Sequence, residues 1–374
     1  MISLIMPVYN AARFLDASIT SILQQTERDF ELIIVNDGST DRSEEIILSS
    51  DDKRIRYVRQ ENKGVGAARE VGVGLAKGDF IVFQDADDIS LPRRFQAMKS
   101  RFIADDIGIV HSDMLLIDET DRPIGYWTAS NIDKSRLLRF FLQVGTPFNN
   151  PTMMLRREVM RDFHYDARLR IGEDSDMVFN VATQCDSVHI PEPLVLYRRY
   201  ADSLTKQGDY DIHVLYVRKF LEQHSLRELF PEFAWGQYED VNIVAMASIL
   251  MVLFLVRRGL IPDAQEWSNK INRGECSENA KKFIAAIESL LAGRYEAGIK
   301  LLEQCSPRDW VIENYLGEAK ALLGDFTQAC GHFLRSLRLN PLYGEPVENL
   351  KALGMCRGLN LIDNTWAKFA NAGK

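Results

Sequence analysis

The sequence has few cysteines, and their spacing matches neither a disulfide framework nor a zinc site. Its 374 residues include five cysteines, an odd number, and no two of them form a Cys-x-x-Cys pair. A disulfide framework and a zinc site are therefore disfavoured, and a reducing cytoplasm is the expected compartment. The N-terminus shows no basic region followed by a cleavage site, so we expect no signal peptide.

The motifs of several common enzyme classes are also missing. No Gly-x-x-x-x-Gly-Lys-Ser/Thr loop occurs, which disfavours a P-loop NTPase. Gly64-Val65-Gly66 lacks the third glycine of a dinucleotide fingerprint and follows the third predicted strand rather than the first, which disfavours a Rossmann oxidoreductase. The Gly-x-Ser-x-Gly elbow of serine hydrolases is absent. The six histidines lack zinc-protease spacing, so we take them as structural or surface residues.

An excess of positive charge is missing as well. The chain has 45 Lys and Arg against 53 Asp and Glu, a formal net charge of −8, so it lacks the basic surface of a general nucleic-acid binder. With 46% hydrophobic residues it is expected to fold, and its length predicts two or three domains. The uncharged run Val241–Val256 is shorter than the ~20 residues of a membrane span. We expect a buried core helix there rather than a membrane-surface contact or a span.

The first hundred residues alternate between short apolar runs and segments with helical periodicity. Helical spacing occurs over Ala11–Gln25 and Ala67–Ala76. The apolar runs predict buried strands at Ile2–Met6, Glu31–Asn36, Ile55–Val58 and Phe80–Phe83. This alternation predicts an α/β fold with a mostly parallel, Rossmann-type sheet covered by helices on both faces.

Polar residues follow the predicted strands where ligands bind in such sheets, at the carboxyl ends. Tyr9-Asn10, Asn36-Asp37 and Asp85–Asp88 all occupy such positions. In the last segment, Asp85 and Asp87 stand two residues apart after a wholly apolar strand. Paired carboxylates of this kind can bind Mg²⁺ or Mn²⁺. The alternative interpretation is a solvated acidic loop.

Beyond residue 205 the pattern becomes helical throughout. Leu290–Glu296 is echoed by Leu322–Thr327, and Pro307 and Pro341 lie 34 residues apart, the period of tetratricopeptide repeats. We therefore predict an α/β domain over residues 1–205 and an all-α domain over residues 206–374, with tetratricopeptide-like hairpins near 280–345. An irregular helical bundle is the alternative.

Taken together, these segments resemble family 2 inverting glycosyltransferases, which have a GT-A-type nucleotide-sugar fold. The resemblance covers roughly residues 1–205 and depends on the joint order and spacing of its parts. These parts are Pro7-Val8-Tyr9-Asn10, Val35-Asn36-Asp37-Gly38-Ser39-Thr40-Asp41, Asn62-Lys63-Gly64-Val65-Gly66-Ala67-Ala68-Arg69, Asp85-Ala86-Asp87-Asp88, Gly172-Glu173-Asp174 and Tyr197-Arg198 with Ser203.

The resemblance implies a binding site for a nucleotide diphosphate sugar, with a UDP-sugar favoured, and a Mn²⁺ or Mg²⁺ ion. Asp87 would be the main protein ligand of the metal, with Asp85 beside the ribose and the metal shell. Asp37 would accept a hydrogen bond from the base. The nucleoside pocket would be lined by Pro7, Tyr9 and Asn10. Phosphate or base contacts are expected from Lys63, Arg69 and Arg198, although surface charge and helix packing would also explain the first two.

The resemblance also implies a catalytic base. Asp174 is the candidate, and Glu173 is the alternative base or a residue that orients the acceptor. Both could also simply begin a helix, because an apolar helical face follows them. The family often has a histidine shortly after the Tyr-Arg pair, where this chain has Tyr200, so a third protein ligand to the metal is in doubt. Trp127 and Asn149-Asn150 fall in acceptor-shaping segments, although ordinary packing would also explain Trp127.

The expected function is inverting, metal-dependent transfer of a sugar to a hydroxyl of a glycan or glycolipid acceptor, in the synthesis of a cell-surface polysaccharide or glycolipid. The expected location is the cytoplasm, with peripheral contact at the inner face of the membrane as an extension. Two alternatives involve the helical repeats. In the first, the acceptor is a protein side chain and the repeats recruit the polypeptide. In the second, the chain is an adaptor that binds a protein partner.

Overall fold

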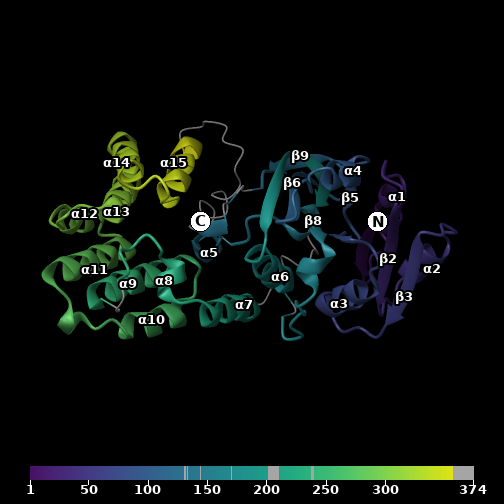
Figure 1. Ribbon diagram of the computed structural model, residues 1–374, viewed down its shortest axis with the longest axis horizontal. Helices are drawn as coiled ribbons and strands as arrows, with labels where there is room; N and C mark the ends of the chain where they lie inside the picture. Colours follow the sequence, from purple (N-terminus) through teal and green to yellow (C-terminus); the bar gives the residue numbers. More distant parts are fainter. Residues whose placement is uncertain are drawn as a thin grey trace. The chain divides into compact units, whose positions relative to one another are not determined.

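The computed structural model describes residues 1–129, 132, 134–143, 145–169, 171–200, 210–236 and 240–356 (Figure 1). Its contacts divide the chain into two compact units, the first running to Phe220 and the second beginning at Leu221. This division falls inside helix α7 (Tyr210–Gln223). The boundary predicted near residue 205 lies outside the described residues.

Four parallel strands form the first half of the sheet in the first unit. They are β1 (Ile2–Val8), β2 (Phe30–Asp37), β3 (Ile55–Gln60) and β4 (Phe80–Phe83), in the spatial order β3-β2-β1-β4. Every residue of β1 is buried. Its first residue pairs with the first residues of both β2 and β4, so the carboxyl ends of these strands meet at one edge. The four strands predicted from the apolar runs are confirmed.

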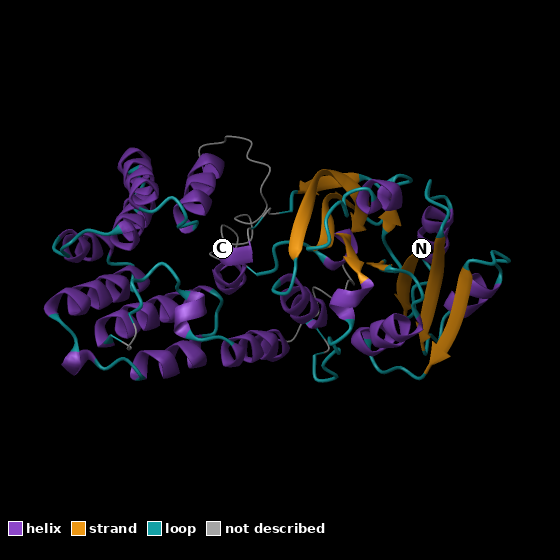
Figure 2. Ribbon diagram, viewed as in Figure 1, coloured by secondary structure: helices purple, strands orange, loops and turns teal. Residues whose placement is uncertain are grey.

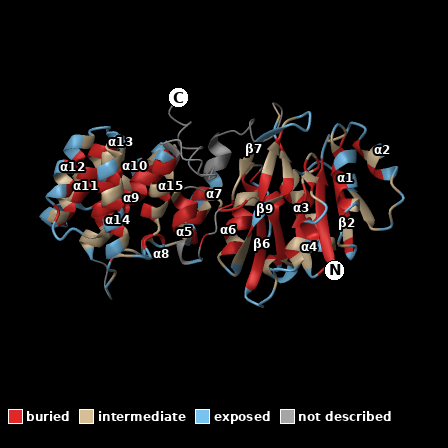
Figure 3. Ribbon diagram, turned by 90° about the horizontal axis from the view of Figure 1, so that it is seen from above, coloured by how far each residue is buried: buried red, intermediate tan, exposed pale blue. Residues whose placement is uncertain are grey.

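Helices cover both faces of these strands. Leu4 and Met6 of β1 belong to a core shared with α1 (Leu15–Leu23), α2 (Ser43–Leu48) and α4 (Arg94–Lys99). Ile5, which points to the opposite face, belongs to a second core with α3 (Val65–Leu75), α5 (Lys134–Gln143) and α6 (Glu173–Ala182). Figure 3 shows the strands buried between these layers. The α/β prediction is confirmed.

The second half of the sheet is mixed. From β4 the order continues through β8 (Met153–Arg156), β6 (Ile107–Ile117), β9 (Asp186–Arg198) and β5 (Ile89–Ser90), and β7 (Pro123–Trp127) pairs with β6 (Figure 2). Only the β6–β9 ladder is parallel in this half. Two 3₁₀ turns, η1 (Asn150–Thr152) and η2 (Arg157–Met160), flank β8. The mostly parallel pairing predicted for the sheet therefore holds for its first half, whereas the second half is mainly antiparallel.

All regular secondary-structure elements among the described residues of the second unit are helices. Its elements are α8 (Leu226–Leu229), α9 (Val241–Arg257), α10 (Ile261–Asn269), η4 (Arg273–Glu275), α11 (Glu278–Leu291), α12 (Tyr295–Glu303), α13 (Trp310–Leu322), α14 (Phe326–Leu339) and α15 (Glu345–Cys356). Residues 245–255 of α9 are all buried, and α9 packs against α8, α10 and α11. The expected buried core helix is confirmed. Across the described segments, no helix is both long and apolar enough to span a membrane.

The two similar sequence segments occupy equivalent places in this unit. Each ends one helix and begins the next, in the packed pairs α11–α12 and α13–α14. The turns contain Gly293 and Gly324, both with positive φ. Helix α12 also packs against α13, and α14 against α15, so consecutive pairs stack on one another. This arrangement agrees with a repeat, and its identity as a tetratricopeptide repeat stays a prediction.

Candidate active site

The loops that follow β1 and β2 are held together by side-chain hydrogen bonds. Asn10, with a positive φ of 50°, accepts a hydrogen bond on Oδ1 from the Thr40 amide at 2.8 Å. Its own amide donates to Ser39 Oγ at 3.1 Å. Tyr9 beside it is 52% exposed, whereas Pro7 is buried within β1. Asn10 thus shapes the loop, and both Tyr9 and Asn10 are exposed there.

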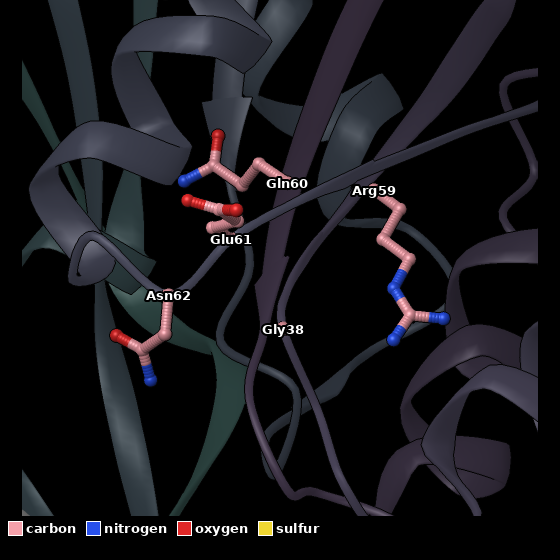
Figure 4. Close-up of a pocket in the computed structure, with 5 residues that line it drawn as sticks. All are labelled: Gly38, Arg59, Gln60, Glu61 and Asn62. Atoms are coloured by element: carbon pink, nitrogen blue, oxygen red, sulfur yellow. The ribbon is translucent and has the colours of Figure 1, made fainter.

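Asp37 anchors the loop that leads from β3 to α3. Its Oδ1 accepts hydrogen bonds from the Gln60 side chain at 2.6 Å and the Lys63 amide at 2.9 Å, and its Oδ2 accepts one from the Gly64 amide at 2.9 Å. The carboxylate is buried, yet Oδ2 retains the capacity for a second hydrogen bond. The Lys63 side chain is exposed. An open depression lined by Gly38 and residues 59–62 lies beside this loop (Figure 4).

The acidic turn, residues Asp85–Asp88, follows β4 directly. Burial, and then the neighbouring charge of Asp85, raises the pKa of Asp87 to about 6. Asp88 is buried; its Oδ1 accepts from the Arg198 amide at 2.9 Å, and its Oδ2 has no hydrogen-bond partner. Burial, and then Asp87 and Asp85, raises the pKa of Asp88 well above its ordinary value. The protein therefore gathers negative charge in this turn without fully compensating it.

Arg69 of α3 connects the acidic turn to α6. Its guanidinium contacts Asp85 Oδ1 at 3.0 Å and forms an ion pair with Glu173, and it is almost wholly buried. Burial disfavours its charge, but Asp85 and Glu173 raise its pKa above the ordinary value. Arg69 is therefore a fixed cation between two of the predicted site acids, and its side chain is not open to solvent as a free phosphate ligand would be.

Glu173 and Asp174 lie in the first turn of α6, as their helix-start interpretation predicts. The helix begins after Gly172, whose φ is 84° and where a Cβ would lie 2.6 Å from the Tyr216 ring, so only glycine fits. Burial raises the pKa of Glu173 to about 7, although Arg69 opposes the shift. Asp174 is half-buried, and its Oδ1 accepts from the Ser175 amide at 2.7 Å. The two adjacent acids thus have different surroundings.

Arg198, the last residue of β9, is directed into the protein. Its Nε donates to the Asp87 carbonyl at 2.8 Å, and its Nη1 donates to the Asp118 carbonyl at 2.9 Å and pairs with Asp121 at 2.7 Å. The side chain is 2% exposed. In this conformation Arg198 holds the backbone of the acidic turn in place. Its predicted contact with a diphosphate stays a prediction.

Tyr200 is a member of the site that sequence reasoning noted only as a departure from the family pattern. Its hydroxyl donates a hydrogen bond to the Asp87 carboxylate. The one signal available in the sequence was its position two residues after Arg198.

The residues expected near the acceptor are partly buried. Trp127 on β7 packs against the core that contains Ile5 and is half-buried, which agrees with the packing alternative. Asn150 is buried, and neither polar atom of its side chain has a partner. Asn149 contacts Met114 Sδ at 3.7 Å. No role of these residues toward an acceptor follows from these contacts.

The predicted site residues therefore form three groups. The first comprises the loops around Tyr9, Asn10 and Asp37. The second is the acidic turn with its supports from β9. The third is the ion-pair network of Asp85, Arg69 and Glu173, of which Arg69 and Glu173 are buried, with Asp174 beside it. All three belong to the first unit, and the β-strand residues among them lie at strand ends.

Comparison with known proteins agrees with this architecture. The model of the family described as glycosyl transferase family 2 matches residues 3–163. The glycosyltransferase GlyG of Streptococcus pneumoniae is 29% identical over 220 residues, which are 55% of this chain and 73% of GlyG. An uncharacterized glycosyltransferase of Methanocaldococcus jannaschii is 29% identical over 272 residues, 69% of this chain and 91% of the relative.

A solved structure shares the fold. The crystal structure of S. aureus TarS 1–349 in complex with UDP-GlcNAc aligns over 90% of this chain and 91% of that chain, with a TM-score of 0.51 and 15% sequence identity. The predicted GT-A-like architecture is thereby supported at the level of fold. Because the family model matches residues 3–163 and the curated relatives are glycosyltransferases, residues 3–163 are a glycosyl transferase family 2 domain, and the chain is a glycosyltransferase.

Proposed function

We propose that this glycosyltransferase moves a sugar from a nucleotide diphosphate sugar, a UDP-sugar in particular, to an acceptor hydroxyl with inversion at the anomeric carbon. The observation that carries the proposal is the under-compensated acidic turn at the sheet edge, next to the buried Arg69 and the acids of α6. A group of carboxylates held in this way is stabilised when a cationic partner binds.

The acidic turn fits a divalent cation. Carboxylate oxygens are the ligands that Mg²⁺ and Mn²⁺ prefer, and Asp88 Oδ2 is a buried oxygen without a partner. Within the described ranges no cluster of three or more His, Cys, Asp or Glu residues has metal-binding geometry. Asp87, assisted by Asp85, would therefore hold an ion whose other ligands are phosphate oxygens and water. Bound there, the ion would stabilise the negative charge that develops on the departing diphosphate.

The two acids of α6, Glu173 and Asp174, would have different roles. Glu173 is buried and its carboxylate is engaged by Arg69, so it would position Arg69 rather than reach an acceptor. Asp174 is more accessible, and the hydrogen bond it accepts comes from the adjacent Ser175 amide. We therefore assign Asp174 as the base that takes the proton of the acceptor hydroxyl. A single displacement with this base inverts the anomeric centre and requires no covalent intermediate.

The nucleoside would bind over the loops after β1 and β2. Tyr9 offers an exposed ring for stacking, and Asp37 Oδ2 can accept one further hydrogen bond, which suits a donor N–H of uracil. Lys63, exposed on the adjoining loop, is available to a phosphate. The GT-A-fold neighbour TarS was crystallised with UDP-GlcNAc, which supports a UDP-sugar as the donor class.

A glycan or glycolipid is the proposed acceptor, in the synthesis of a cell-surface polysaccharide or glycolipid. The stacked helix pairs α11–α12 and α13–α14 keep a protein acceptor as the second candidate, because arrays of helix pairs present extended binding surfaces. The two candidate acceptors are distinguished by testing whether the sugar is transferred to a glycan or glycolipid or to a protein.

The decisive test is a screen of UDP-, GDP- and dTDP-sugars with Mn²⁺, read as release of the nucleoside diphosphate. Release from one donor that disappears in EDTA is the expected result. Asp174→Asn should bind the same donor with unchanged affinity by calorimetry and lose transfer. If no donor is turned over with any acceptor preparation, or if EDTA has no effect, the proposed metal-dependent transfer is wrong.

A further inference from the structure

Three groups from residues 198–200 donate hydrogen bonds to the acidic turn. The Arg198 amide donates to Asp88 Oδ1 at 2.9 Å, and the Arg198 guanidinium donates to the Asp87 carbonyl at 2.8 Å. The Tyr200 hydroxyl then donates to the Asp87 carboxylate. Of these contacts, the last is the one made to the side chain that the proposed function assigns to the metal.

The position of Tyr200 is fixed independently of Asp87. Its ring packs against Phe14, with the centroids 5.3 Å apart and the planes at 52°. The Arg198 guanidinium lies over the same Phe14 ring, 4.4 Å from its centroid. Strand β9 also pairs with β5, with Leu196 opposite Ile89, so the chain reaches the acidic turn in a defined register. The hydroxyl is therefore presented to Asp87 by a supported ring.

The chemistry of a phenol limits what Tyr200 can do for a cation. A neutral phenol is a hydrogen-bond donor, whereas Mg²⁺ and Mn²⁺ favour carboxylate, phosphate and water oxygens. A carboxylate that accepts a hydrogen bond on one oxygen keeps the other free for a metal, and such partners orient the ligand. A tyrosine at this position can thus act through Asp87, while a histidine there could itself be a ligand.

We propose that Tyr200 is a positioning residue, whose hydroxyl orients the Asp87 carboxylate for binding the divalent cation that accompanies the nucleoside diphosphate. The inference rests on the proposed function, because it assumes that Asp87 binds this cation. It adds a residue that follows β9 to a donor site built from the segments that follow β1, β2, β3 and β4.

The test compares Tyr200→Phe with the wild type by calorimetric titration of UDP, GDP and dTDP, in Mn²⁺ and in EDTA. The phenylalanine ring retains the packing on Phe14 and loses only the hydroxyl. With the diphosphate that the wild type binds, we expect affinity in Mn²⁺ to fall by about tenfold or more. Affinity in EDTA and the thermal midpoint should stay unchanged. The electron paramagnetic resonance of Mn²⁺ should show less bound ion at the same total concentration.

A control variant separates positioning from a general effect. Tyr126→Phe removes a hydroxyl that donates to another buried aspartate, Asp113, at 2.8 Å, and should leave binding in Mn²⁺ unchanged. Equal affinity of Tyr200→Phe and wild type in Mn²⁺ would overturn the positioning role alone. A wild type that binds none of the diphosphates more tightly in Mn²⁺ would overturn the proposed metal dependence, and the positioning role with it.

Discussion

The acidic turn and Glu173 of the first unit and Glu313 of the second unit of this glycosyltransferase are acids in opposite kinds of surroundings. In the first unit, burial and like-charged neighbours raise the pKa values of Asp87, Asp88 and Glu173. In the second, Glu313 of α13 is equally buried, yet His332 at 2.8 Å and Arg335 at 2.9 Å lower its pKa against the effect of burial.

The difference separates an acid that stabilises the fold, Glu313, from acids that are available to a ligand, those of the acidic turn. The partners of Glu313 come from α14, so its charge joins two helices and is neutralised within the fold. The acids of the acidic turn crowd one another, and one oxygen of Asp88 has no partner. A folded protein retains such a cost at places where a ligand supplies the missing interaction. This contrast leads to four predictions, described from the largest expected effect to the smallest.

Asp87→Asn should lower turnover by about a thousandfold or more while leaving the fold intact, because it removes the proposed metal ligand. The thermal midpoint should stay the same or rise, since the variant relieves repulsion with Asp85 and Asp88. Nucleoside diphosphate release and thermal unfolding measure the two effects. Turnover within tenfold of the wild type would remove Asp87 from the metal site.

The stability of the first unit should fall as pH rises through the range set by Glu173. Its pKa is about 7 in the fold against 4.5 ordinarily, so between these values the folded chain holds a proton that the unfolded chain has lost. The free energy of unfolding therefore decreases as pH rises across this window. Glu173→Gln should flatten this slope.

Urea unfolding at about pH 5 and about pH 7.5 measures that slope. Glu313 should have the opposite effect on the pH dependence of stability. Because the fold lowers its pKa, it adds stability at pH values above its ordinary pKa, and this stability is lost as pH falls. A Glu173→Gln variant with the wild-type slope would show that another group causes the pH dependence.

Glu313→Gln should destabilise the second unit by about 2 kcal/mol, because His332 is buried and loses its charged partner, while the half-exposed Arg335 can be hydrated. Turnover should be unchanged within twofold or so. Unfolding of the full chain and nucleoside diphosphate release are the two readouts. A large loss of turnover without a loss of stability would contradict the structural role of this acid.

Tyr315→Phe should cost about 1 kcal/mol, because its hydroxyl donates to the buried Glu345 at 3.0 Å and Tyr343 supplies a second donor to the same carboxylate. The same chemical change at Tyr200 is expected to affect metal-linked binding and not stability. Thermal unfolding of both variants makes this comparison. A stability loss in Tyr200→Phe as large as in Tyr315→Phe would show that the Tyr200 hydroxyl stabilises the fold, as the Tyr315 hydroxyl does.

The first half of the sheet could be predicted from the sequence because its strands are continuous apolar runs, as expected where both faces are buried. The second half could not. Strand β9 contains Pro191, Pro193 and charged residues, and its identity as a strand depends on pairing with β6 and β5, which lie far away in the sequence. Such long-range pairing leaves no local periodicity to detect.

The candidate site shows the same division between local and distant information. The acids after β4 and at the start of α6 were predicted, because strand ends and helix starts are local features. The ion pair of Arg69 with Glu173 joins residues 104 positions apart, so the sequence suggested a phosphate contact where the structure has a buried bridge. Asn10 and Arg198 likewise use their polar groups to hold loops and turns, which only the folded chain reveals.

The place of β4 in the sheet has a consequence for how such a protein can diversify. This short strand pairs in parallel with β1 and antiparallel with β8, so it is the seam between the two halves. Substitutions in β6, β7 and β8 can accumulate without breaking the hydrogen bonds among β1, β2 and β3. The acidic turn emerges at this seam, directly after β4, and Arg198 at the end of β9 supports it from the second half. Variation in the second half is therefore tolerated as long as this support of the acidic turn is kept.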